Sequence, residues 1–348
     1  MKIQKETQKS FNCNKKAYFI FSMVLFLMFA LGGIMGVFVY PTFFTGAKDK
    51  DELQNITQKG QRQGGKYKFI NPLLECDYSS DLEYKNIYSI EKKVSEIIER
   101  LVDGTNVSSV SLYYRDLNNG PWFGINEDEN YKPASLLKVP VFIAYLKKIE
   151  NNLGLLSSTL SYKENELEMP DPADNLESLA PEKEYTLEKL FERMVVNSDN
   201  QAYTLLVNRI DTKELDQVMQ DLGMTVPDSN LTENILTAKS YASLFRVLYN
   251  SSYVSRSASE YALTLMSYAR FDSGITKDLP EEIAISHKFG LRKSEDLTGD
   301  VYLHDCGIVY YPEKPYLICI MTKGKDFEQL AGVISTLSKK IYEEIKKQ

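Results

Sequence analysis

Residues 132–146 read KPASLLKVPVFIAYL. The residues that follow Lys138 are almost all apolar, which predicts a helix buried on most of its surface. Ser135 and Lys138 are three positions apart, and residues at that spacing share one face of a helix. We therefore expect the Ser135 hydroxyl and the Lys138 amine to be neighbours where this helix begins. Pro140 lacks a backbone N–H, so we expect it to remove one hydrogen bond and bend the helix beyond Lys138.

A serine with a lysine three residues later is suited to nucleophilic chemistry. A neutral amine can take the proton of the hydroxyl as the oxygen attacks a carbonyl, and the start of a helix favours the negative charge that develops. The pattern alone is weak, because S-x-x-K arises by chance about once or twice in a chain of this length. Ser89-Ile90-Glu91-Lys92 is a second copy, which we expect on the solvent side of another helix.

Two further short motifs follow. Ser198-Asp199-Asn200 offers a hydroxyl that can relay a proton to a leaving amine and an amide that can hold a substrate. The same three residue types are also ordinary helix caps. Farther on, the run IAIS leads into a strand with Lys288, which can bind a substrate carboxylate, and Gly290, which lets a substrate backbone approach. The alternative for Lys288 is an ordinary exposed lysine.

The three motifs in this order resemble the set S-x-x-K, S-D-N and K-[TS]-G of class A β-lactamases and penicillin-binding proteins. The resemblance extends over roughly residues 85–345. It implies a serine hydrolase that forms an acyl-enzyme from a β-lactam or a related amide. Catalytic roles would fall on Ser135 as the nucleophile and Ser198 as the proton donor to the leaving nitrogen. Lys138 would either accept the proton of Ser135 or organise the water that does.

The resemblance also implies how substrate is held. The substrate-binding residues would be Asn200, Lys288, Gly290 and Leu291. The backbone N–H groups of Ser135 and Leu291 would form an oxyanion hole, which is usually the largest single electrostatic contribution to such a reaction.

The sequence departs from the family pattern at two places. Phe289 stands where the third motif usually has threonine or serine. A hydroxyl that helps to bind a substrate carboxylate is therefore missing, and a hydrogen bond to a charged group contributes about 1.5–3 kcal/mol. The loop that carries the deacylating glutamate of the family is about ten residues too short. Glu233 is the candidate deacylation base and Asp228 is another, although Glu233 also fits a solvent-facing acid at a helix start.

The spacing of apolar residues predicts the order of the elements. We expect a helix over 87–103, a strand over 109–116, a hairpin turn at Asn119-Gly120, and mostly helices over 134–270. Strands follow at IAISHKFG, VYLHDCGIVYY and PYLICIMT, and a helix closes the chain. This order predicts an α+β fold, with an antiparallel sheet flanked by the terminal helices and a separate all-helical lobe. A groove between the two lobes would hold the site.

Residues 17–40 contain no charged side chain. A stretch of about 24 such residues is long enough to span a bilayer as a helix. Five lysines and one acid precede it, which places the N-terminus in the cytoplasm. We therefore expect a single-pass cell-membrane protein with four parts: a cytoplasmic basic tail (1–16), a transmembrane helix (17–40), a linker (41–80) and an extracytoplasmic hydrolase domain (81–348). Cleavage after the weak signal at 45–47 is the alternative.

The composition excludes several other classes of protein. A formal net charge of −7 argues against nucleic acid as a partner. Two histidines and four scattered cysteines do not provide the spacing of a metal site. We expect no cofactor and no metal, and a small-molecule β-lactam or a cell-wall peptide as the substrate.

The last two strands carry one cysteine each. A turn at 312–314 would place Cys306 directly opposite Cys319, at a distance that a disulfide tolerates. An oxidising exterior would preserve such a bridge. The alternative is two buried free thiols that pack as small apolar groups.

Three functions fit these observations. The first is β-lactam hydrolysis through Ser135. The second is a D,D-peptidase that acts on peptidoglycan stem peptides with the same nucleophile and passes the acyl group to an amine. The third is a non-catalytic, membrane-tethered binding module, favoured by Phe289 and the short loop but opposed by the presence of Ser135, Lys138 and Ser198.

Overall fold

The computed structural model describes residues 56–62, 67–80, 82–118, 120–150, 152–170, 176–224, 235–294 and 298–348, together with Met23. The chain divides into two units, Met1–Ile56 and Thr57–Gln348, and the second is described below. Apart from Met23, the predicted transmembrane helix at 17–40 lies outside the described residues. Within the described ranges, no helix combines the length and the apolar character needed to cross a membrane.

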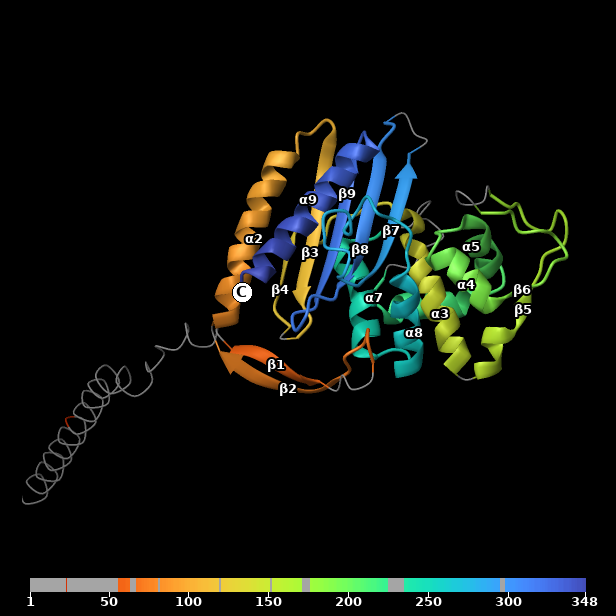
Figure 1. Ribbon diagram of the computed structural model, residues 1–348, viewed down its shortest axis with the longest axis horizontal. Helices are drawn as coiled ribbons and strands as arrows, with labels where there is room; N and C mark the ends of the chain where they lie inside the picture. Colours follow the sequence, from red (N-terminus) through yellow and green to blue (C-terminus); the bar gives the residue numbers. More distant parts are fainter. Residues whose placement is uncertain are drawn as a thin grey trace, which may run out of the picture. The chain divides into compact units, whose positions relative to one another are not determined.

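A five-stranded antiparallel sheet forms the centre of the domain (Figure 1). Its strands, in spatial order, are β4 (Trp122–Ile125), β3 (Val107–Asp116), β9 (Tyr316–Gly324), β8 (Val301–Val309) and β7 (Ile285–Lys293). Because β7 is at the edge, every second backbone group along it is left unused by the sheet.

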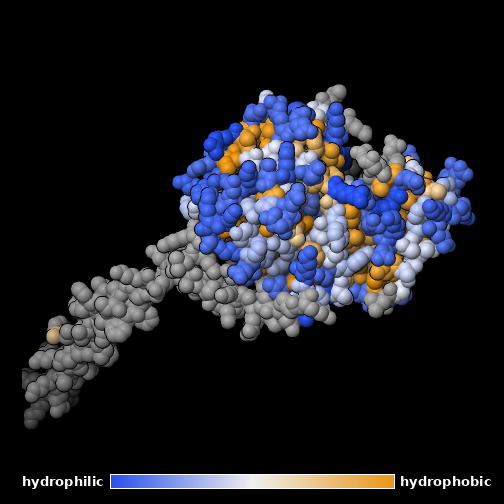
Figure 2. Space-filling view, viewed as in Figure 1, coloured by the Kyte–Doolittle hydropathy of each residue, from blue (hydrophilic) through white to orange (hydrophobic). Residues whose placement is uncertain are grey.

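Two terminal helices cover one face of this sheet, α2 (Leu82–Leu101) and α9 (Phe327–Lys346). They lie side by side across the strands in Figure 1. Ile90, Val94 and Ile98 of α2 recur at helical spacing and pack into the core beneath. Full burial of one such side chain contributes about 1.5–3 kcal/mol. Hydrophilic side chains predominate on the outward surface over these helices (Figure 2).

The other face packs against the helical part of the chain. Its helices are η1 (Ala134–Leu137), α3 (Lys138–Glu150), η2 (Leu153–Ser157), α4 (Leu187–Val195), α5 (Asn200–Val207), α6 (Thr212–Asp221), α7 (Ala238–Asn250) and α8 (Arg256–Met266). Phe142 of α3, Phe191 of α4 and Tyr241 of α7 belong to one continuous apolar core with the sheet. Two small antiparallel ribbons complete the description: β1 (Ile56–Arg62) with β2 (Leu73–Ser80), and β5 (Thr159–Leu160) with β6 (Tyr185–Thr186).

The predicted arrangement of an antiparallel sheet, terminal helices and a helical lobe is confirmed. The first helix begins at Leu82 rather than at 87. The prediction rested on the apolar periodicity that begins at Ile90, and this pattern does not fix where the helix starts. The hairpin predicted at Asn119-Gly120 joins β3 to β4, with Arg115 opposite Trp122; Asn119 itself lies outside the described residues.

The closing hairpin has the predicted register. Strands β8 and β9 place Cys306 directly opposite Cys319, and the two cysteines form a disulfide. Both lie fully buried in the core between the sheet and the helical lobe. Of the two alternatives for these cysteines, the bridge is the one present.

Candidate active site

Ser135 and Lys138 are neighbours, as their spacing predicts. Ser135 lies on η1, a single 3₁₀ turn, and Lys138 is the first residue of α3. Lys138 Nζ is 2.9 Å from Ser135 Oγ. In a 3₁₀ turn, side chains three residues apart lie directly above one another. The contact therefore arises in a tighter turn than the α-helix expected there.

Pro140 removes less from the helix than expected. It lies in the first turn of α3, where backbone N–H groups have no partner within the helix. The carbonyl four residues before it, that of Leu136, accepts a hydrogen bond from the hydroxyl of Tyr241 at 3.1 Å. The Leu136 carbonyl, which cannot accept a hydrogen bond from Pro140, therefore has a hydrogen-bond partner on α7.

Lys138 is surrounded by neutral oxygen atoms. Besides Ser135 Oγ, its amine contacts Asn200 Oδ1 at 2.7 Å, Ser198 Oγ at 3.2 Å and the carbonyl of Ser198. Only 2% of the residue is exposed. Burial lowers the pKa of Lys138 to about 7, although the negative charge of Asp199 opposes the shift. Near neutral pH the amine is therefore available in its unprotonated form.

A strained turn presents Ser198 to this amine. Ser198 has φ 57°, in the left-handed region that residues other than glycine rarely adopt. The buried carboxylate of Asp199 holds the turn: it accepts from Gln201 N at 3.0 Å, capping α5, and from Arg193 Nε at 2.6 Å. Asp199 therefore braces the loop, and the motif is both a helix cap and part of the site.

Lys288 approaches Ser198 from the opposite side. It is fully buried on β7, so the alternative of an ordinary exposed lysine is wrong. Lys288 Nζ is 2.8 Å from Ser198 Oγ and 3.0 Å from the carbonyl of Phe289. Burial and the positive charge of Lys138 hold the pKa of Lys288 well below its usual range. The two lysines and the two serines thus form one cluster, with Ser198 between the amines.

Gly290 explains how β7 comes so close to η1. A Cβ atom at this position would lie 2.8 Å from the carbonyl of Pro133 and 3.1 Å from Leu136 Cγ. The absence of a side chain at Gly290 therefore lets η1 approach β7, and the contact of Gly290 with a substrate backbone stays a prediction. Leu291, the next residue along the edge strand, is 44% exposed.

Two of the predicted site residues cannot be placed. Glu233 and Asp228 lie outside the described residues, so the deacylation base stays a prediction. The second S-x-x-K copy is on α2, where Ser89 and Lys92 are both exposed, as expected.

Two contacts of β7 were not predicted from the sequence. His287 Nδ1 lies 2.9 Å from Asp305 Oδ1, and Asp305 Oδ2 accepts from Ile275 N at 2.9 Å. Phe289 stacks on Phe271, with the ring centroids 4.1 Å apart and the planes at 11°. In each pair the partners lie 18 residues apart in the sequence, and no local pattern identifies them.

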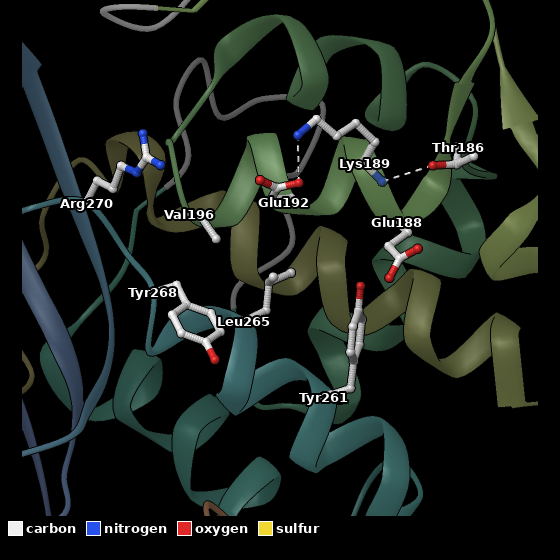
Figure 3. A pocket seen from close by; sticks show the side chains of 9 residues that line it. All are labelled: Thr186, Glu188, Lys189, Glu192, Val196, Tyr261, Leu265, Tyr268 and Arg270. Carbon is white, nitrogen blue, oxygen red and sulfur yellow. Dashed lines mark hydrogen bonds and ion pairs between the residues drawn. The ribbon is translucent and has the colours of Figure 1, made fainter.

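A separate groove of about 690 Å³ lies between α4 and α8 (Figure 3). Glu188 and Glu192 of α4 face Tyr261 and Leu265 of α8 across it, and Arg270 lies at one end. None of the three motifs contributes a residue to its lining. Among the residues that the structure describes, no cluster of three His, Cys, Asp or Glu side chains could hold a metal ion.

Comparison with known proteins agrees with this architecture. Residues 92–345 match the model of the β-lactamase enzyme family. A β-lactamase from Sphaerobacter thermophilus has a similar structure, with a TM-score of 0.64 and 20% identity over 74% of this chain and 97% of that one. A variant of PBP-A, solved as the acyl-enzyme complex with penicillin G, gives a TM-score of 0.64 and 20% identity over 75% and 98%.

A third solved structure, the TLA-1 extended-spectrum β-lactamase, gives a TM-score of 0.65 and 17% identity over 75% of this chain and 99% of that one. At these identities the likeness concerns the fold. No sequence match is found among curated proteins.

Proposed function

The chain belongs to the β-lactamase enzyme family, and we propose that it is a serine hydrolase that opens a β-lactam or a related amide through an acyl-enzyme on Ser135. The observation that carries this proposal is the contact of the Lys138 amine with two hydroxyls, Ser135 Oγ at 2.9 Å and Ser198 Oγ at 3.2 Å. A nucleophile and a base within hydrogen-bond reach are the core of covalent catalysis.

The surroundings of Lys138 favour its action as a base. An unprotonated amine has two N–H groups and one lone pair. The Ser198 carbonyl and Asn200 Oδ1 can only accept hydrogen bonds, so they take the two N–H groups. The lone pair is then left for a hydroxyl, and Ser135 is the nearer of the two. The lowered pKa of Lys138, about 7, suits a base that works near neutral pH.

The proposed acylation step balances as follows. Ser135 Oγ forms a bond to the carbonyl carbon while its proton passes to Lys138 Nζ. The carbonyl oxygen becomes an oxyanion, which the N–H groups of Ser135 and Leu291 would stabilise; the close approach of β7 to η1 at Gly290 supports this pairing. When the C–N bond breaks, the leaving nitrogen takes a proton from Ser198 Oγ, and Lys138 passes the proton that it took from Ser135 to Ser198 Oγ, 3.2 Å away, so that both groups regain their starting protonation. Lys288 donates a hydrogen bond to Ser198 Oγ and keeps it in place.

Ser135→Ala provides the direct test. The full-length chain is incubated with penicillin G and its intact mass is followed over time. We expect one adduct in the wild type, none in Ser135→Ala, and an unchanged adduct in Ser89→Ala, the matched control from the exposed second motif. An adduct that persists in Ser135→Ala overturns the proposal. Release of the acyl group to water over minutes supports a lactamase, and an adduct released only on adding a peptide amine supports a D,D-peptidase.

We also propose that residues 17–40 anchor the enzyme in the cell membrane with the catalytic domain outside. The absence of charge in this segment supports the proposal, and so does the Cys306–Cys319 bridge, because disulfides persist in oxidising compartments. The test is protease digestion of spheroplasts that express the full chain. A domain that is digested from outside and co-sediments with membranes is expected, and a protected domain in the soluble fraction contradicts the proposal.

A further inference from the structure

Phe289 changes the chemistry of the site at one wall. Its ring is half-buried and stacks on Phe271, with a centroid distance of 4.1 Å. The Lys288 ammonium lies 4.2 Å from the Phe289 ring centroid and 2.8 Å from Ser198 Oγ. The aromatic pair is therefore one side chain away from the reacting groups, at the position where a hydroxyl is expected to meet a substrate carboxylate.

Lys288 has no hydrogen left for such a carboxylate. A lysine ammonium carries three N–H donors. The amine faces Ser198 Oγ, the Phe289 carbonyl and the Phe289 ring. The side chain is also completely buried. Lys288 can thus orient Ser198, but a substrate anion would have to displace one of these partners to reach it. Burial and Lys138 lower the pKa of Lys288 as well, which weakens its attraction for an anion.

The neighbouring surface is also a poor match for a negative charge. Leu291, two residues beyond Phe289, is apolar and 44% exposed. Aromatic faces carry negative partial charge and offer no hydrogen-bond donor. The cations nearest in the sequence follow Leu291 along the strand: Arg292 and Lys293 are exposed at the end of β7, and Arg292 has interactions of its own. Arg270 lines the groove between α4 and α8.

We propose that the acyl-donor site selects uncharged substrates, namely β-lactams or esters without a free carboxylate beside the scissile bond, because Phe289, Phe271 and Leu291 replace the carboxylate-binding wall. This inference rests on the proposed function and specifies its substrate class. Phe289 is the residue that determines the selection.

The experiment compares penicillin G with its methyl ester, which differ only in the carboxylate. The acylation rate of the full-length wild-type chain is measured with each compound by intact mass. We expect the methyl ester to react at least as fast as the free acid. This measurement needs no variant, so it stays decisive if a substituted chain fails to fold.

Two variants test the assignment to Phe289. Phe289→Thr restores a hydroxyl and should shift the ratio of rates about 10- to 150-fold toward penicillin G, as expected for one hydrogen bond to a charged group. Phe289→Leu, the matched control, removes the ring without adding a hydroxyl and should keep the preference for the ester.

Each remaining outcome overturns a specific statement. If the wild type reacts with penicillin G at least tenfold faster than with the methyl ester, the inference is overturned and the proposed function is not. If Arg270→Ala or Arg292→Ala then reduces this preference for penicillin G, the substrate carboxylate is bound by that arginine. An unchanged ratio in Phe289→Thr removes Phe289 from its role. Absence of any adduct at Ser135 with both compounds overturns the proposed function and this inference with it.

Discussion

Lys138 in the site and the two lysines near Asp300 differ in the charge of the groups that they contact. Lys323 and Lys325 contact the carboxylate of Asp300 at 3.0 and 2.6 Å, and this contact raises the pKa of Lys323 above its ordinary value. Lys138 contacts four neutral oxygens instead, and its pKa falls to about 7.

The difference separates lysines that stabilise the fold from lysines that can exchange protons. A carboxylate within hydrogen-bond distance keeps an amine charged, whereas burial among neutral acceptors makes its charge easy to lose. Lys138 and Lys288 are both buried, and neither forms an ion pair with a carboxylate of the described residues. Asp199, whose charge raises the pKa of Lys138, pairs with Arg193. Asp305, whose charge raises the pKa of Lys288, contacts His287.

Replacement of Lys138 should give the largest effect. Lys138→Ala removes the proton acceptor, and positioned proton transfer contributes about 10²–10⁴-fold. We expect the acylation rate of penicillin G to fall by that factor, a far larger effect than the one on stability. Lys325→Ala, a lysine of the paired kind, should leave the rate unchanged. A loss of less than about tenfold in folded Lys138→Ala would exclude Lys138 as the base.

The buried ion pair beneath the site should be the next most sensitive feature. Asp199→Ala leaves Arg193 buried without its partner, which typically costs 3–5 kcal/mol of stability, and removes a helix cap worth about 1 kcal/mol. Asp211→Ala is the matched control, because Asp211 caps α6 in the same way, accepting from Lys213 N at 2.8 Å, but is exposed and has no such arginine. Urea unfolding measures both losses. Equal losses in the two variants would show that the Arg193 pair adds nothing.

The pH dependence of acylation should reveal the charge of Lys138. The unprotonated amine is the active form, and its pKa is about 7. The rate should therefore rise with pH through that value, by about tenfold between pH 6 and pH 8, and then level off. Asp199 raises this pKa, so Asp199→Ala should move the rise to lower pH if it folds. A flat profile between pH 6 and 8 would contradict the assignment.

The order of elements and the motif contacts were predictable from the sequence because both depend on local spacing. Alternation and helical periodicity identify the strands and helices, and the i,i+3 rule places Ser135 beside Lys138. The predicted turn at 312–314 set the register of β8 against β9. This register places Cys306 opposite Cys319.

Features that depend on distant contacts were not predictable. The stacking of Phe271 on Phe289 joins residues 18 positions apart, and the burial of Lys288 depends on the packing of β7 against η1. Gly290 was predicted as a point of close approach for a substrate backbone, and the structure shows a close approach of η1 to the same residue. A sequence shows that space is needed at a glycine, and only the fold shows what occupies it.

The smallest effect is expected at the paired lysines. Lys325→Ala removes one of two amines from Asp300, but 45% of its side chain is exposed and Lys323 stays in place. Exposed pairs contribute about 0.2–1 kcal/mol, so the free energy of unfolding should fall by no more than that, and by less in high salt. The amines lower the pKa of Asp300 in the folded chain. The ion pairs of Asp300 therefore stabilise the fold at pH values above the ordinary carboxyl pKa, and this stabilisation is lost as the pH falls through the lowered pKa and the carboxylate takes up a proton. The difference between wild type and Lys325→Ala should therefore vanish in acid. A loss well above 1 kcal/mol at pH 7 would show that Asp300 and its lysines behave like the buried pair beneath the site.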